Sequence, residues 1–275
     1  DEVVEGRDGF QLTNTGTIFN TSDETDDEEA ADGVQYGAGT LVNETGALIE
    51  GADDGVDVDS GTITNRGTIR SRSAIGGAAI DVDAEGEDDA PAPSLMIENL
   101  GTIVGGVGIN HDLASVAVQT IVNEGTIEGT QGTAILFAPG QGASTLTLRG
   151  ESRIIGDVLF GGASDTLIVE DITSGLLINS VFDGGLGDDL VDFTGFELGD
   201  VLLTALMGDI LRVDLEAGNG DRLMGEFRGF ETFRFAGGPE LTQSELSQVA
   251  PIPLPGTLPL ILAGLGGLAA LRRRR

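Results

Sequence analysis

The sequence contains no cysteine, tryptophan or lysine, and it has a single tyrosine and a single histidine in 275 residues. Without cysteine the fold cannot rely on disulfides. Aromatic residues make up only 4% of the chain, so a core must be built from Ile, Leu and Val. The 46 acidic residues outnumber the 14 arginines and give a net charge of −32. Such a chain repels phosphate backbones, which excludes nucleic acid as a partner.

Glycine is abundant instead, with 44 residues, and much of it belongs to a repeat. An Asn-centred unit recurs with an aliphatic residue two positions before the Asn, Gly two or three after it, and another aliphatic residue two further on. Its asparagines are Asn14, Asn43, Asn65, Asn99 and Asn123. A spacing of two places the aliphatic residues on one face of an extended chain. We expect Asn and Gly to form a corner, because both tolerate positive φ.

A second unit follows each Asn unit, in which a small residue leads into a short strand. Its two same-face residues are Val34 and Tyr36 in the first copy, and His111, the only histidine, occupies the tyrosine's place in the fourth. Successive repeat asparagines are 22 to 34 residues apart, a period typical of solenoids. The repeats, over 12–137, therefore predict an all-β fold, a right-handed parallel β-helix with coils about 4.8 Å apart.

Residues 138–236 keep the short strands but replace the Asn unit with Gly-Asp pairs, and we expect the same coil to continue through them. The strands expected there are Thr145–Leu148, Ile154–Phe160, Thr166–Val169, Leu176–Ile178, Leu190–Phe193, Val201–Leu203, Ile210–Leu215 and Phe230–Phe235. The predicted β-helix body thus covers 1–236, and residues 237–250 are expected to be a polar linker.

The final segment, 251–275, has three parts: a proline motif, an apolar run over Gly256–Leu271, and a basic end. The motif residues are Pro251, Pro253, Leu254 and Pro255, and the basic end is Arg272, Arg273, Arg274 and Arg275. The run is just shorter than the roughly 17–25 residues of a transmembrane helix, which favours a transient anchor. Arginines at its end are expected to stay cytoplasmic, leaving the body outside.

This layout resembles the PEP-CTERM class of C-terminal sorting signals, in particular the Val-Pro-Leu-Pro-Ala variant, although Ile252 and Gly256 replace its Val and Ala. The resemblance covers only about residues 250–275. It implies export from a Gram-negative bacterium, with a signal peptide upstream of Asp1. It also implies transient inner-membrane anchoring and recognition by an exosortase-like membrane transpeptidase that cuts near the prolines.

The body resembles the passenger domains of autotransporters and adhesins, whose coils carry the same Asn-x-Gly-Thr-Ile units. Within it, the stretch Asp183–Val191 resembles one calcium-binding nonapeptide of RTX proteins, Gly-Gly-x-Gly-x-Asp-x-aliphatic-x. That resemblance implies a calcium site at Gly184, Gly185, Gly187 and Asp189. A full site needs stacked copies, and the nearest candidate, Gly161–Leu167, is one residue short. An ordinary Gly-Asp turn between coils is the competing interpretation.

Three functions follow from these observations. The first is an exported structural or adhesive protein of the cell surface, outer membrane or extracellular matrix, which contacts polysaccharide or other surface material and is not an enzyme. The second is a calcium-stabilised, RTX-like secreted module. The third is a β-helix polysaccharide-degrading enzyme using paired carboxylates. The acidic runs Asp26–Glu29 and Glu87–Asp89 are irregularly spaced, as in solvated loops, so no catalytic residues are assigned.

Overall fold

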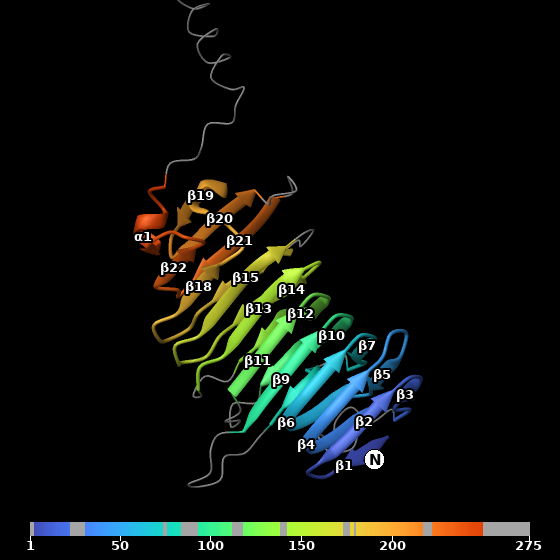
Figure 1. Ribbon diagram of the computed structural model, residues 1–275. Helices are drawn as coiled ribbons and strands as arrows, with labels where there is room; N and C mark the ends of the chain where they lie inside the picture. Colours follow the sequence, from blue (N-terminus) through green and yellow to red (C-terminus); the bar gives the residue numbers. More distant parts are fainter. Residues whose placement is uncertain are drawn as a thin grey trace, which may run out of the picture.

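The computed structural model shows a long β-solenoid whose coils stack along one axis (Figure 1). It describes residues 3–22, 31–73, 76–83, 93–111, 118–137, 142–172, 177–178, 180–216 and 222–249. The strands of the repeat region are β1 (Val4–Gly6), β2 (Phe10–Asn14), β3 (Thr17–Phe19), β4 (Val34–Asn43), β5 (Leu48–Gly51), β6 (Val56–Asn65), β7 (Thr68–Ser71), β8 (Ala78–Val82), β9 (Ser94–Asn99), β10 (Thr102–His111), β11 (Val118–Asn123) and β12 (Thr126–Leu136).

The second half continues with shorter elements. They are β13 (Thr145–Gly150), β14 (Arg153–Leu159), β15 (Thr166–Ile172), β16 (Leu177–Ile178), β17 (Val181–Asp183), β18 (Leu190–Phe193), the 3-10 turn η1 (Leu198–Asp200), β19 (Val201–Met207), β20 (Ile210–Glu216), β21 (Arg222–Arg228), β22 (Thr232–Phe235), β23 (Glu240–Thr242) and helix α1 (Gln243–Leu246).

Each coil contributes to three parallel sheets. The first sheet holds the strands that lead to the repeat asparagines: β2, the ends of β4 and β6, β9, β11, β13, β15, β18 and β22. The second holds the Thr-Ile strands β3, β5, β7, the starts of β10, β12 and β14, and β16. The third holds the second units, from β1 through β8 to β17 and β21. This arrangement confirms the predicted all-β, parallel β-helix fold.

The core consists of columns of aliphatic side chains repeated at the same position in each coil. In the second sheet Ile49, Ile69, Ile103, Ile127 and Ile154 are all fully buried. Strand alternation is as predicted, since Ile127 is buried while the preceding threonine is only half-buried. The last coils replace aliphatic residues with stacked phenylalanines such as Phe193 and Phe235, whose ring centroids are 5.0 Å apart.

The repeat asparagines form a continuous hydrogen-bonded ladder inside the solenoid. Each side-chain Nδ2 donates to the Oδ1 of the asparagine in the next coil, over 2.9, 2.9, 2.8 and 2.7 Å from Asn14 to Asn123. The last Nδ2 donates to Ser152 Oγ at 2.6 Å. The same Nδ2 groups also donate to backbone carbonyls of the next coil, those of Leu48, Thr68, Thr102 and Thr126. The ladder therefore satisfies buried amides that would otherwise cost free energy.

Three of the repeat glycines, Gly67, Gly101 and Gly125, are required by close stacking, which corrects the expectation that they supply positive φ. A Cβ on Gly101 would lie 2.1 Å from the carbonyl oxygen of Gly67, and one on Gly125 would lie 2.1 Å from that of Gly101. Of the units' glycines, only Gly46, in the copy with the inserted residue, has positive φ, at 79°. The backbones of successive coils thus approach too closely at this corner for any side chain.

An antiparallel meander interrupts the parallel coil before residue 236, although β21 and β22 still pair parallel with β17 and β18. Strands β19, β20 and β21 pair antiparallel, and β21 joins this meander to the third sheet beside β17. The reason is the turn at Gly208-Asp209, where Gly208 has φ of 71°. A two-residue turn can connect only antiparallel strands, since parallel strands need a long crossover. The expectation that the coil continues through the Gly-Asp pairs is therefore wrong at this pair.

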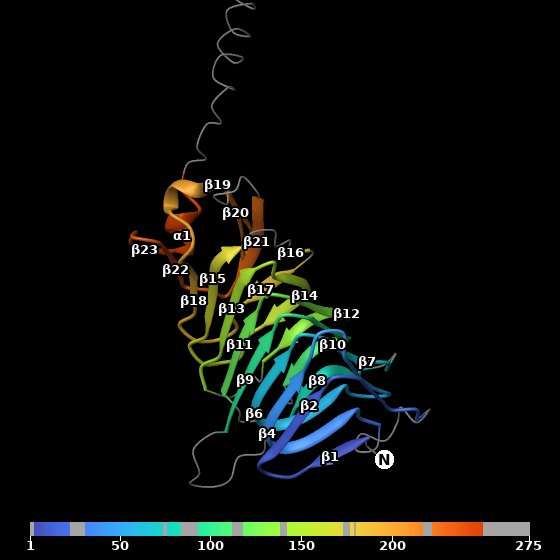
Figure 2. The same ribbon diagram turned by 45° about the vertical axis from the view of Figure 1, so that its right-hand side comes forward.

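The segment expected to be a linker instead closes the end of the solenoid. Strand β23 pairs antiparallel with β22, and Thr242 and Glu245 form a capping box at the start of α1. Leu246 is fully buried, and Val249 packs against the core. Figure 2 shows α1 beside β19 and β22, at the opposite end of the molecule from β1. Residues 237–250 are mostly polar, so the sequence alone did not single out Leu246 and Val249, the two apolar residues that pack against the core.

The Asn ladder predicts a specific loss of stability. Asn65→Ala removes the side chain that bonds both Asn43 and Asn99 and leaves buried polar groups short of partners, at a cost of roughly 2–4 kcal/mol. The adjacent Thr64→Ala, on the outer face, should cost less than about 1 kcal/mol. Urea denaturation of the two variants measures the difference. Equal unfolding midpoints would contradict a stabilising ladder.

Candidate functional site

Several sequence-predicted sites lie outside the described residues. These are the sorting residues Pro251, Pro253, Leu254, Pro255 and Arg272 to Arg275, together with the acidic runs Asp26–Glu29 and Glu87–Asp89. In the part of the chain that the structure describes, no helix is long and apolar enough to cross a membrane. His111 is described, and it is a core residue: it is 2% exposed and occupies the position of Val82 in the adjacent coil.

The nonapeptide connects β17 to β18 at a corner of the coil, and its glycines are explained by contact with the coil beneath. Gly185 and Gly187 have φ of 84° and 143°. A Cβ on Gly185 would lie 2.1 Å from the carbonyl oxygen of Gly161, and one on Gly187 2.2 Å from that of Ala163. The structure therefore places the two glycine-rich stretches that the sequence singled out directly against each other.

Asp189 belongs to a column of acidic side chains that bind backbone N–H groups of the preceding coil. Asp165 Oδ1 accepts from Ser144 N at 2.6 Å, Asp189 Oδ1 from Asp165 N at 2.7 Å, and Glu231 Oε2 from Asp189 N at 2.8 Å. The strands that follow these residues pair in the same order. Each carboxylate thus ties the start of its strand to the coil below.

The carboxyl group of Asp189 is only partly satisfied by this arrangement. Asp189 is 1% exposed, and its second oxygen, Oδ2, has no hydrogen-bond partner. Burial, opposed by the bond from Asp165 N, raises the pKa of Asp189 to about 7. Asp165 differs, because its Oδ2 also accepts from Gly161 N at 3.1 Å. Burial likewise raises the pKa of Asp165.

Calcium prefers six to eight oxygen ligands, which tests whether this corner suits the ion. The stacked aspartates offer one unengaged carboxylate oxygen, Asp189 Oδ2, since the other three already accept backbone N–H groups. Among the described residues, no group of three or more His, Cys, Asp or Glu side chains is placed to hold a metal ion. The geometry accounts for Gly184, Gly185, Gly187 and Asp189 as a turn and supplies few metal ligands.

A second set of carboxylates lies near the N-terminal end of the solenoid. Asp32 Oδ1 accepts from Asp54 N at 3.1 Å, and Asp54 Oδ1 accepts from Ala78 N at 2.6 Å. On β6 the outward-facing Asp57 accepts from Gln35 Nε2 at 2.9 Å and is in register with Asp81. Burial, followed by the neighbouring charge of Asp81, raises the pKa of Asp54 to about 9. Burial also raises the pKa of Asp57 to about 8, with Asp83 adding to it.

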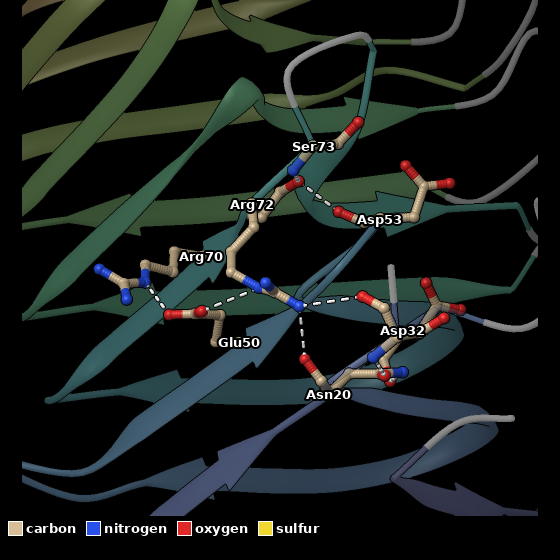
Figure 3. A network of polar contacts seen from close by, with 9 residues as sticks. Asn20, Asp32, Glu50, Asp53, Arg70, Arg72 and Ser73 are labelled. Carbon is tan, nitrogen blue, oxygen red and sulfur yellow. Dashed lines mark hydrogen bonds and ion pairs between the residues drawn. The ribbon is translucent and has the colours of Figure 1, made fainter. Parts of the chain in front are cut away.

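A buried glutamate and two arginines form the most connected polar cluster (Figure 3). Glu50 is 1% exposed, and its two carboxylate oxygens contact Arg70 Nε and Arg72 Nε. Arg72 Nη2 donates to Asn20 O at 2.6 Å and to Ser22 O at 3.2 Å. The Arg72 guanidinium also lies 4.8 Å from the ring centroid of Phe19. Arg72 therefore fixes the chain where it leaves the first coil, just before the acidic run.

The sequence contained a signal for this cluster that the search for repeats missed, namely opposite charges at one position of the repeat. Glu50 and Arg70 occupy the same position in successive copies of the Thr-Ile strand, directly after Ile49 and Ile69. Opposite charges at one repeat position predict an ion pair between neighbouring coils. The column of Ser144, Asp165, Asp189 and Glu231 was missed for a different reason: its spacing follows the strand register and not a fixed sequence period.

Comparison with known proteins identifies no relative of this chain. No family model, curated protein or solved structure matches the chain.

The raised aspartate pKa values predict that the protein loses stability as the pH rises. Asp54 and Asp57 keep their protons up to about pH 9 and 8 when folded, whereas the unfolded chain releases them near pH 4. The folded state thus binds more protons between these limits, so the free energy of unfolding falls across that range. Melting curves at pH 5.5 and 8.5 in high salt measure the decrease.

Two substitutions separate this effect from general charge repulsion. Asp54→Asn and Asp57→Asn should each flatten the pH dependence, while Asp171→Asn, at an exposed position, should leave it unchanged. A melting temperature that rises between these pH values, or a slope that all three variants share, would contradict the assignment.

Proposed function

We propose that this chain is an exported bacterial protein of the cell surface or extracellular matrix, with a structural or adhesive role, which is sorted through its C-terminal tail. The observation that carries the proposal is how far the described core extends. Val249 packs against the core, and its carbonyl accepts a hydrogen bond from Thr204 Oγ1 at 3.4 Å, only two residues before Pro251. The described core thus reaches to within two residues of the proline motif.

This boundary suits a tail that a membrane enzyme handles separately from the body. An exosortase-like transpeptidase that cuts near Pro251–Pro255 would leave every described residue of the core, up to Val249, in the released part. Before cleavage, the apolar run would hold the protein transiently in the inner membrane, with the four arginines on the cytoplasmic side. After it, the body would remain at the cell surface, in the outer membrane or in the extracellular matrix.

The solenoid surface supports a structural or adhesive role over catalysis. Parallel strands repeat outward-facing side chains at the coil spacing, which suits repeated weak contacts with an extended polymer or other cell-surface material. Asp81 on β8 occupies such a position and is half-buried, in register with the more deeply buried Asp57, and Asn110 of the next coil donates to it at 2.6 Å. This amide holds the Asp81 carboxylate in a fixed position. The net charge of −32 excludes nucleic acid and favours neutral or cation-bridged material.

The sorting proposal predicts that deletion of 251–275 leaves a folded but mislocalised body. The truncated protein should melt within about 2 °C of the full chain, because it keeps every described residue of the core. Cell fractionation and surface labelling in the native host measure its location. The matched control is the double variant Pro253→Ala, Pro255→Ala, which keeps the apolar run and the arginines but alters the motif. It should block cleavage near the prolines and leave membrane anchoring unchanged. A truncated protein that reaches the same surface location in the same amount would contradict sorting by the tail.

A calcium-stabilised module is the second candidate, favoured by one observation, the buried and unpartnered Oδ2 of Asp189. A cation at that oxygen would offset the free-energy cost of burying the charged carboxylate, which is what raises the pKa of Asp189. The glycine-rich stretches stacked below and above it would have to supply the remaining ligands through backbone carbonyls.

Thermal melts with millimolar calcium or a chelator, at fixed high ionic strength, distinguish this module from a structural turn. A specific site would stabilise the fold by about 2.7 kcal/mol at a hundredfold excess over its Kd. Asp189→Ala should abolish that gain, whereas Asp188→Ala, at the exposed neighbouring position, should not. From the ligand geometry we expect a small shift that is equal in wild type and both variants, through screening of the acidic surface. A large shift lost only in Asp189→Ala would establish the calcium module.

A further inference from the structure

Strand β19 is an open edge at the C-terminal end of the third sheet. It pairs with β20 through residues Val201 to Met207, and no other described strand pairs with its opposite edge. Figures 1 and 2 both show it at the closed end of the solenoid, beyond β20 and β21. An edge strand presents a row of backbone N–H and C=O groups that another strand can bind.

The composition of β19 is unusual for an edge in so acidic a chain. Its seven residues, Val-Leu-Leu-Thr-Ala-Leu-Met, include no charge and no proline. Leu206 and Met207 are each 50% exposed, and Met224 on β21 is 37% exposed. The other edge at this end, β23, has only three residues and carries Glu240, which pairs with Arg234. Short length and charge are common ways to protect an edge, and β19 uses neither. A bulge is another, and β19 has one register shift, between Val201 and Leu203, which leaves the pairing of Leu203–Met207 regular.

We propose that β19 pairs antiparallel with β19 of a second copy, joining two solenoids end to end. The free edge requires backbone partners, which a lipid surface cannot provide. The first part of the chain's own tail is a poor strand partner, because Pro251, Pro253, Pro255 and Pro259 lack N–H groups. A second β19 offers seven uncharged residues and satisfies the self-complementarity that a two-fold interface requires.

The surrounding structure leaves room for this pairing. Thr204 opposes Val213, which is 1% exposed, so its side chain points toward the core, where it meets Val249 O. Val249 thus lies against the inner face of the meander. A two-fold axis near Thr204 would place Met207 beside Val201 of the second copy. The acidic bodies would then extend in opposite directions, which keeps like charges apart.

Sedimentation of the full chain in detergent and high salt tests the proposal, since detergent disperses the apolar tail. Met207→Glu adds a carboxylate to the uncharged edge, next to Asp200 of the second copy, and should weaken dimerisation at least tenfold. Met96→Glu is the matched control, because Met96 is 46% exposed on β9, a strand paired on both sides. We expect the wild type and this control to dimerise alike.

Hydrogen exchange identifies the contact directly. In the wild type, protection of the amides in 201–207 should rise with protein concentration, while protection in β23 should not. If Met207→Glu lowers the melting temperature, Ala205→Glu repeats the test nearer the centre of the strand. A chain that stays monomeric up to high concentration overturns the proposal. A dimer that both β19 variants leave intact also overturns it, because the contact then lies elsewhere. Protection of β19 that appears only when an extended peptide is added overturns it as well.

Discussion

The in-register stacking of one coil on the next is the constraint on which this structure depends. Because the strands are parallel and successive coils are about 4.8 Å apart, each side chain lies directly against its equivalent in the neighbouring coil. Only residues that tolerate a copy of themselves suit such a column. Isoleucine packs on isoleucine, asparagine bonds asparagine, and glycine permits backbone contact where Gly67, Gly101 and Gly125 meet.

The same constraint makes an acidic composition costly, and the structure shows three ways of managing it. Carboxylates at corners accept backbone N–H groups of an adjacent coil, as Asp54 and Asp165 do. Outer carboxylates are bridged by amides, as Asp57 is by Gln35. Where a glutamate is buried, the next coil supplies arginines, as at Glu50. The first two devices both leave the pKa of the buried carboxyl raised, and the pKa values of Asp54 and Asp57, about 9 and 8, keep these two groups protonated at neutral pH.

Sequence reasoning succeeded where a residue's role is repeated and failed where it occurs once. The Asn unit and its aliphatic neighbours recur with a fixed spacing, and their strand register was predicted before any contact was known. The antiparallel meander and the α1 cap are single events whose Gly-Asp turn and apolar anchors, Leu246 and Val249, resemble ordinary loop sequence. The Asp189 corner is intermediate: its stacking partner was found, but the orientation of its carboxylate toward Asp165 N depends on atomic contacts that spacing does not encode.

The Asn ladder gives the rod a polarity. Every Nδ2 donates toward the C-terminus, and its additional bonds to carbonyls such as Thr68 O and Thr102 O fix that direction, because only an N–H can donate to a carbonyl. Removing a coil from the N-terminal end leaves a buried acceptor unpaired, whereas opening the ladder at Ser152 leaves a buried donor unpaired. Buried donors are tolerated less well than acceptors. The two ends of the ladder are therefore unequal: opening it costs less free energy at the first coil than at Ser152.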